Sequence, residues 1–140
     1  MADDRQKRRQ ELAATIEGRS DEEITQGMVA QGADTVLQQI FAGMCEAFLP
    51  DKAGSQSAVI QYDVNVGGTT HSYQLKVAGG KCELVKGAAG PARVTLALLA
   101  ADFLRLVTGK LNGMQAFMTG KLKLTGDMMF AQVMQGWFEQ

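Results

Sequence analysis

The 140-residue chain has few of the residues that build metal centres, disulfide frameworks or catalytic sites. Its two cysteines, Cys45 and Cys82, lie far apart in the sequence, without a CxxC motif or a neighbouring histidine. Neither a zinc site nor a disulfide framework is predicted, and we expect both thiols to be reduced and buried. The one histidine, His71, has no serine or cysteine nucleophile at a recognisable spacing, so we expect it to be structural or exposed. We therefore expect no metal, no cofactor and no enzymatic activity.

Positive and negative residues are balanced in the sequence, and it contains no long apolar run. Lys and Arg number 14 against 15 Asp and Glu, and this balance argues against nucleic acid as a main partner. No stretch of about 18 apolar residues could span a bilayer, and the charged N-terminus lacks the apolar segment of a signal peptide. We expect a cytoplasmic protein, with at most transient membrane contact through the basic cluster of Arg5, Lys7, Arg8 and Arg9.

The hydrophobic content, 46%, suffices for one domain with a genuine core. Residues 3–18 predict a polar helix with a thin apolar stripe, which we expect to be loosely docked. The capping box Ser20-Asp21-Glu22-Glu23 starts a second short helix. Residues 34–49 predict a core helix that Pro50 stops. Its apolar face comprises Leu37, Ile40, Phe41, Met44 and Phe48.

After residue 57 the hydrophobic period changes to two, which is typical of strands with one covered face. Two Gly-Gly pairs fall where hairpin turns are needed. We expect these strands to form an antiparallel meander. The predicted strands are residues 60–66, 71–77, 81–86 and 93–98.

The last third predicts two short helices, a strand at 121–125 and a final helix. Gly109 and Gly120 end the short helices, Asn112 caps the second, and Asp102 and Asp127 are predicted as helix caps. The final helix has a wide apolar stripe rich in methionine, a flexible side chain that suits a variable apolar ligand. Ordinary core packing on the sheet explains the same stripe. Its members are Met129, Phe130, Val133, Met134, Trp137 and Phe138.

Five segments together resemble the sterol carrier protein 2 (SCP2) family. The most specific is the run F-M-x-G-K-L-K-x-x-G-D, and the resemblance covers roughly residues 34–138. The segments are S-Y-Q-L-K at 72–76, A-R-V-T-L at 92–96, A-D-F at 101–103, T-G-K-L at 108–111 and A-F-M-T-G-K-L-K-L-T-G-D at 116–127.

The resemblance implies an α+β fold with a five-stranded, mainly antiparallel sheet covered by helices around an apolar cavity. We expect an N-terminal helical extension at 1–32 and an SCP2-like lipid-binding domain at 33–140. The implied function is non-catalytic binding, extending to intracellular transfer, of a fatty acyl, sterol-like or isoprenoid lipid. The alternative is an accessory module that dimerises or presents a lipid-like substrate to a partner enzyme. The predicted ligand-binding residues are Phe103, Leu106, Phe117, Met118, Leu122, Leu124, Met129, Phe130, Val133, Met134 and Trp137.

Three positions depart from the family pattern. Leu99 stands where relatives usually have a capping Ser or Thr, so the following helix should lack a side-chain cap. Tyr73 stands where an indole is common, which would alter one wall of the cavity. The chain ends without an S-K-L-like tripeptide, so we expect cytoplasmic rather than peroxisomal location.

Overall fold

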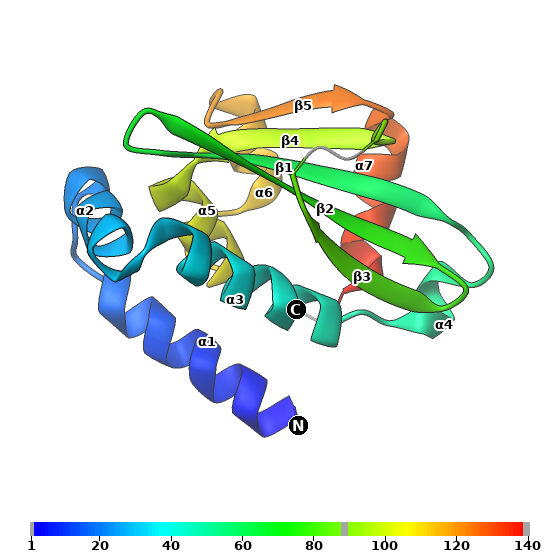
Figure 1. Cartoon of the computed structure of the whole chain (residues 1–140), viewed down its shortest axis with the longest axis horizontal. Coiled ribbons are helices and arrows are strands. Elements are labelled where there is room, and N and C mark those ends of the chain that lie inside the picture. Colours follow the sequence, from blue (N-terminus) through cyan, green and yellow to red (C-terminus); the bar gives the residue numbers. More distant parts are fainter. Residues whose placement is uncertain (1, 88–89, 139–140) are drawn as a thin grey trace.

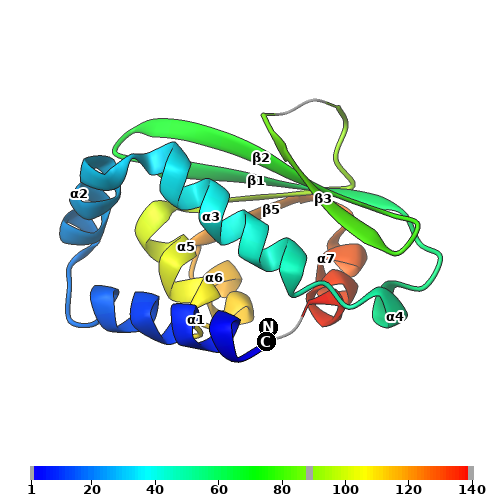
Figure 2. The same cartoon turned by 60° about the horizontal axis from the view of Figure 1, so that its bottom comes forward.

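A computed structural model describes residues 2–87 and 90–138 of the chain. Its centre is a five-stranded mixed sheet in the order β3-β2-β1-β4-β5, and the helices gather on one face of that sheet (Figure 1 and Figure 2). The predicted α+β architecture is therefore confirmed. The strands are β1 (Ala58–Val66), β2 (Thr69–Ala78), β3 (Lys81–Lys86), β4 (Val94–Leu99) and β5 (Leu122–Gly126). The helices are α1 (Ala2–Ile16), α2 (Asp21–Gln31), α3 (Ala33–Glu46), α4 (Pro50–Ala53), α5 (Ala100–Val107), α6 (Gly113–Met118), α7 (Met128–Met134) and the 3-10 helix η1 (Gln135–Trp137).

The fourth strand lies elsewhere than in the predicted meander. β1, β2 and β3 are antiparallel neighbours as expected, but β4 lies beside β1 and runs parallel to it, with Ile60 opposite Val94. The connection from β3 crosses the outer face of the sheet, where Gln74 donates from Nε2 to the carbonyl oxygen of Gly90 at 2.7 Å. The meander prediction was wrong because residue alternation specifies the buried face of a strand and does not specify its neighbour.

The core lies between the sheet and α3, around Phe41. The Phe41 ring centroid lies 4.9 Å from that of Tyr73, 5.2 Å from that of Tyr62 and 5.1 Å from that of Phe103. Tilted aromatic pairs at this spacing stabilise a core beyond the burial of their area. Burial raises the pKa of Tyr62, so its phenol stays neutral.

Asp34, in the first turn of α3, ties that helix to the sheet. Its Oδ1 accepts a 2.6 Å hydrogen bond from the Tyr73 hydroxyl and lies 3.1 Å from His71 Nδ1. Its Oδ2 lies 3.2 Å from Lys86 Nζ. The hydrogen bond from Tyr73, reinforced by Lys86, lowers the pKa of Asp34 to about 2. His71 is half-buried in this network, which gives it a structural role.

Helices α1 and α2 pack against α5, and α2 also contacts α3 and β1. The predicted capping box of α2 is present, with Ser20 and Glu23 exchanging side-chain to backbone hydrogen bonds. Ile16, Ile24 and Met28 are buried in the common core. The predicted loose docking of the first helix therefore does not extend to its C-terminal end. The basic cluster predicted at its beginning falls largely on side chains outside the described part of the chain.

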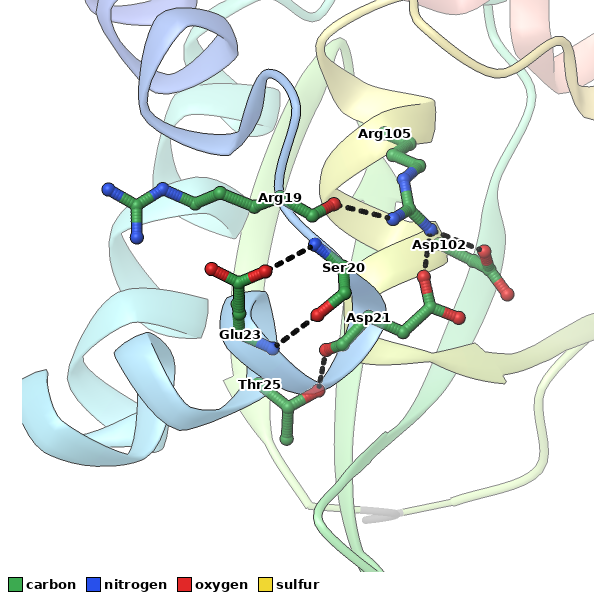
Figure 3. A network of polar contacts seen from close by, with 7 residues as sticks. All are labelled: Arg19, Ser20, Asp21, Glu23, Thr25, Asp102 and Arg105. Atoms are coloured by element: carbon green, nitrogen blue, oxygen red, sulfur yellow. Dashed lines mark hydrogen bonds and ion pairs between the residues drawn. The ribbon is translucent and has the colours of Figure 1, made fainter.

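Arg105 of α5 connects the N-terminal segment to the domain (Figure 3). Its Nη1 forms ion pairs with Asp21 at the start of α2 and, at 3.4 Å, with Asp102. Its Nη2 donates to the carbonyl oxygen of Arg19 at 3.4 Å. One guanidinium thus contacts α2, the α1–α2 connection and its own helix.

Asp102 is not the helix cap that we predicted. Helix α5 begins at Ala100, and Leu99 occupies the N-cap position without a side-chain hydrogen bond, as its apolar side chain requires. Asp102 lies inside the first turn and is only 4% exposed. An acidic residue just before an apolar run fits either position, so the sequence did not distinguish a cap from a buried ion-pair partner.

Helix α3 ends at Glu46, three residues before the predicted end. Phe48 lies outside the helix and forms an isolated antiparallel bridge with Phe138. Pro50 begins α4 instead of merely stopping α3, because the first helical position needs no amide hydrogen.

The final helix is also shorter than predicted. α7 ends at Met134, and Trp137 lies in η1. The carbonyl oxygen of Trp137 accepts a 2.6 Å hydrogen bond from the amide of Leu49. The chain after α7 therefore bonds to the α3–α4 connection, a tertiary contact that helical periodicity alone does not reveal.

The two cysteines are free thiols that lie together at one edge of the sheet. Cys45 of α3 and Cys82 of β3 place their Sγ atoms 2.7 Å apart. Both are half-buried, so they are less buried than expected. Their proximity follows from the packing of α3 on β3, an edge strand with β2 as its only sheet neighbour.

Candidate functional site

The position of α7 is set at its first turn. Asp127 caps the helix as predicted, because its Oδ1 accepts a 2.9 Å hydrogen bond from the amide of Phe130, which lowers the pKa of Asp127. Its Oδ2 lies 3.1 Å from Nε of Arg93, whose guanidinium carbon lies 4.2 Å from the Phe130 ring centroid. The preceding residue, Gly126, brings β5 so close to β4 that an added Cβ would lie 2.5 Å from the Arg93 carbonyl oxygen. These contacts fix the helix at the end of the β4–β5 pair.

Helix α6 is held against β5 by few side chains. Asn112 caps it as predicted, accepting from the amides of Met114 and Gln115 at 2.9 and 3.2 Å. Ala116 is its buried residue. Its large apolar side chains therefore extend into solvent.

The eleven predicted ligand-binding residues fall into three groups by burial. Four exposed residues lie on α6 and α7, five are buried, and two are half-buried on α5 and β5. The exposed residues are Phe117, Met118, Met129 and Val133. The buried residues are Phe103, Leu122, Phe130, Met134 and Trp137, and the half-buried ones are Leu106 and Leu124.

The buried residues belong to one core, but they have different immediate neighbours. The Phe130 and Trp137 rings meet edge to face with centroids 5.1 Å apart. Phe103 instead packs against Phe41 and against Tyr62, whose centroid is 5.9 Å away. The predicted set thus includes the C-terminal aromatic pair and one member of the central cluster.

The exposed residues belong to a larger group of exposed apolar side chains on α6 and α7, the two helices that precede and follow β5. Among the described residues, six of the eight exposed large hydrophobic side chains lie on α6 and α7. Met118 and Met129 are the most exposed of these, at 78% and 80%. Met114 and Met128 were not among the eleven predicted ligand-binding residues, although Met128 begins the methionine-rich final helix. We call this set the α6/α7 apolar surface: Met114, Phe117, Met118, Met128, Met129 and Val133.

A separate pocket of about 610 Å³ lies between α2, the β1–β2 turn and the start of α5. Its described lining includes none of the eleven predicted residues. It combines apolar residues with two carboxylates of the first turn of α2. The lining residues are Asp21, Glu22, Thr25, Gln26, Val29, Ala30, Asn65, Gly67, Leu99 and Ala101.

Within residues 2–87 and 90–138, no helix has the length and apolar character needed to cross a membrane. The same residues hold no cluster of three or more His, Cys, Asp or Glu side chains suited to a metal ion.

The sequence pattern of the SCP-2 sterol transfer family matches residues 37–139, and the chain belongs to this family of lipid- and sterol-binding domains. Sterol carrier protein 2 from Homo sapiens is 38% identical over 69 residues, covering 49% of this chain and 13% of that protein. A fatty acid-binding protein from Yarrowia lipolytica is 37% identical over 83 residues, covering 57% of this chain and 64% of that protein. The chain thus matches about an eighth of the human protein's length and somewhat under two thirds of the yeast protein's.

A solved structure has the same fold. The crystal structure of sterol carrier protein 2 like 2 from Aedes aegypti superposes with a TM-score of 0.60 at 19% sequence identity, covering 74% of this chain and 94% of that chain. The SCP2-like architecture predicted from the sequence motifs is therefore confirmed.

Proposed function

We propose that this chain is a non-catalytic lipid carrier that binds an extended acyl chain at the α6/α7 apolar surface and the buried α7 side chains beside it. The observation that carries the proposal is the exposure of the methionines and the phenylalanine of that surface. Groups of exposed large apolar side chains are typical of sites that contact a ligand or partner. Methionine adapts to apolar molecules of different shape because it is unbranched and polarizable.

The relatives support an acyl or sterol-like ligand. The yeast relative is named a fatty acid-binding protein and the human relative a sterol carrier protein. Burial alone supplies adequate affinity, because ten methylenes at roughly 0.8 kcal/mol each contribute about 8 kcal/mol before ordering costs are subtracted. That corresponds to a dissociation constant of about micromolar.

A fluorescent long-chain fatty acid titrated into purified protein tests the proposal. Met129→Glu places a charge in the α6/α7 apolar surface, and we expect it to weaken binding about tenfold or more. Met118→Glu should act in the same direction. Both side chains are exposed, so neither substitution disrupts the core. Met134, at 4% exposure, is unsuitable because a buried charge there would unfold the protein.

Val29→Glu is the matched control. Val29 is also an exposed apolar residue, but it lines the pocket beside α2. Under the proposal this variant binds the fatty acid as the wild type does. Loss of binding in Val29→Glu, with none in Met129→Glu, would transfer the site to the α2 pocket, and absence of binding in the wild type would rule out an acyl ligand.

An accessory or dimerising module is the second candidate, because an exposed apolar surface also suits contact with a protein. Sedimentation of the wild type and of the Met118→Glu, Met129→Glu double variant separates the two. A dimer that the double variant dissociates supports the module. A wild-type monomer that binds the fatty acid supports the carrier.

A further inference from the structure

Cys45 and Cys82 come from distant parts of the chain and meet where α3 covers the edge of the sheet. Their positions are 37 residues apart, and their Sγ atoms lie 2.7 Å apart. Cys45 is in the last turn of α3, and Cys82 is the second residue of β3. Both cysteines are half-buried residues, so neither is enclosed in the core. A small side-chain adjustment separates this arrangement from bonding distance.

The two thiols are not equivalent. The hydrogen bond between them lowers the pKa of Cys45 and raises the pKa of Cys82. Burial raises the pKa of Cys82 further. Cys45 is therefore the sulfur that ionises first, and as a thiolate it would accept a hydrogen bond from the Cys82 thiol. Because the thiolate is the attacking species in disulfide exchange, Cys45 is the nucleophile and Cys82 the resolving group.

We propose that Cys45 and Cys82 are a redox pair that closes a reversible disulfide between α3 and β3 by exchange with a low-molecular-weight disulfide. The Cys45 thiolate attacks one sulfur of the reagent and expels one thiolate, leaving a mixed disulfide on Cys45. Cys82 then loses its proton and attacks Sγ of Cys45, which expels the second thiolate. The two protein thiols are oxidised, the reagent is reduced to two thiols, and these take up the two protons from Cys45 and Cys82.

The disulfide would act on an edge strand of the sheet. β3 lies at the sheet edge with β2 as its one neighbour, and an edge strand that opens presents unpaired backbone groups to other chains. A covalent link to α3 holds β3 in place when the surroundings are oxidising. Such bonds are transient in reducing compartments, so the pair can report the redox state around the protein.

Native protein equilibrated in buffers of increasing oxidised-to-reduced glutathione ratio tests the proposal. After quenching with a maleimide, intact mass should show loss of both reactive thiols with no glutathione added and no dimer formed. Hydrogen exchange at the β3 amides should slow about tenfold or more in the oxidised form, and excess dithiothreitol should reverse both changes.

Cys45→Ser and Cys82→Ser are the matched variants. Each retains one thiol, and each should bind one glutathione or stay reduced. The Cys82→Ser variant should bind glutathione faster than Cys45→Ser because it keeps the nucleophile. Wild-type protein that ends with two bound glutathiones, with both thiols free at the highest ratio, or as a disulfide-linked dimer overturns the proposal.

Discussion

Gly126 is a position where a single added methyl group changes the packing of β5 on β4. Its φ of 106° is one that residues with a side chain rarely adopt, and its missing Cβ would lie 2.5 Å from the Arg93 carbonyl oxygen. We expect Gly126→Ala to lower the free energy of unfolding by about 2 to 4 kcal/mol. Urea unfolding followed by the fluorescence of buried Trp137 measures the change.

Gly120→Ala is the control for this prediction. Gly120 also has positive φ, but no atom lies within 4 Å of its added Cβ. Placing alanine at this positive φ should therefore lower the free energy of unfolding by only about 1 kcal/mol. Equal effects of the two substitutions would show that close approach at Gly126 contributes nothing.

Asp34 should make stability depend on pH in the acid range. Its pKa in the folded protein is about 2, below the ordinary 3.8, so its ionised form stabilises the protein above about pH 4. That contribution is lost as pH falls from about 4 to about 2. We expect Asp34→Asn to lose less stability than the wild type over this interval, measured by urea unfolding at a series of pH values.

Tyr73→Phe extends the same experiment, because it removes the hydroxyl that donates the 2.6 Å hydrogen bond to Asp34 and keeps the ring in the aromatic cluster. It should show an acid dependence intermediate between wild type and Asp34→Asn. If the free energy of unfolding falls equally steeply between about pH 4 and pH 2 in all three proteins, the proposed role of Asp34 is wrong.

Among the elements, α2 depends on Arg105 for its polar attachment to α5. Arg105→Ala removes the ion pair to exposed Asp21 and leaves the carboxylate of Asp102 buried without its cation. We expect a loss of about 2 to 4 kcal/mol, chiefly from Asp102, because a buried unpaired charge is costly. Limited proteolysis should also cut the α1–α2 connection faster.

Arg19→Ala is the control for the Arg105 prediction. Arg19 contributes its backbone carbonyl to Arg105, and its side chain points away from the network (Figure 3). Substitution should change stability by less than about 0.5 kcal/mol. An effect of Arg19→Ala as large as that of Arg105→Ala would mean that the ion pairs do not hold the segment.

The sequence predicted elements that are governed by local chemistry. The capping box at Ser20, the Asn112 and Asp127 caps and the glycine turns involve residues within a few positions of one another, and the structure confirms them. Contacts between distant residues escaped prediction. The parallel β1–β4 pair, the Arg105–Asp21 ion pair and the Cys45–Cys82 contact have no local signal, because each depends on how complete elements pack.

The candidate site shows the same division. The helical spacing of apolar residues identified the apolar stripe of α7. That spacing does not show which residues of a wide stripe are buried against the rest of the protein. Phe130 and Met134 proved buried, whereas Met129 and Val133 are exposed. The assignment of all eleven residues to a ligand remains a prediction that the fatty acid titration tests.

For the whole molecule, the N-terminal segment should be necessary for stability. Ile16, Ile24 and Met28 are each at most 5% exposed, and their burial contributes about 5 to 8 kcal/mol as an upper estimate. Total stabilities of domains are about 5 to 15 kcal/mol. We therefore expect removal of residues 1–32 to leave a chain without a cooperative urea transition.

Removal of residues 1–11 is the matched control, because it spares these three side chains. Its unfolding free energy should remain within about 1 kcal/mol of the full chain. A chain lacking 1–32 that unfolds cooperatively at the wild-type midpoint would show that α1 and α2 are dispensable.

The parallel pairing of β1 with β4 also governs the order in which the protein can assemble during synthesis. β1 can pair with β2, and β2 with β3, as soon as residue 86 has left the ribosome, because these hairpins join neighbouring segments. The other edge of β1 stays unpaired until β4 has been synthesised, because Ile60 of β1 pairs with Val94 of β4. Loop closure over such a separation is slower than hairpin formation. During this interval the strand that later lies at the centre of the sheet has one unpaired edge. The nascent chain is then most prone to pair with other chains, and chaperone binding would prevent this.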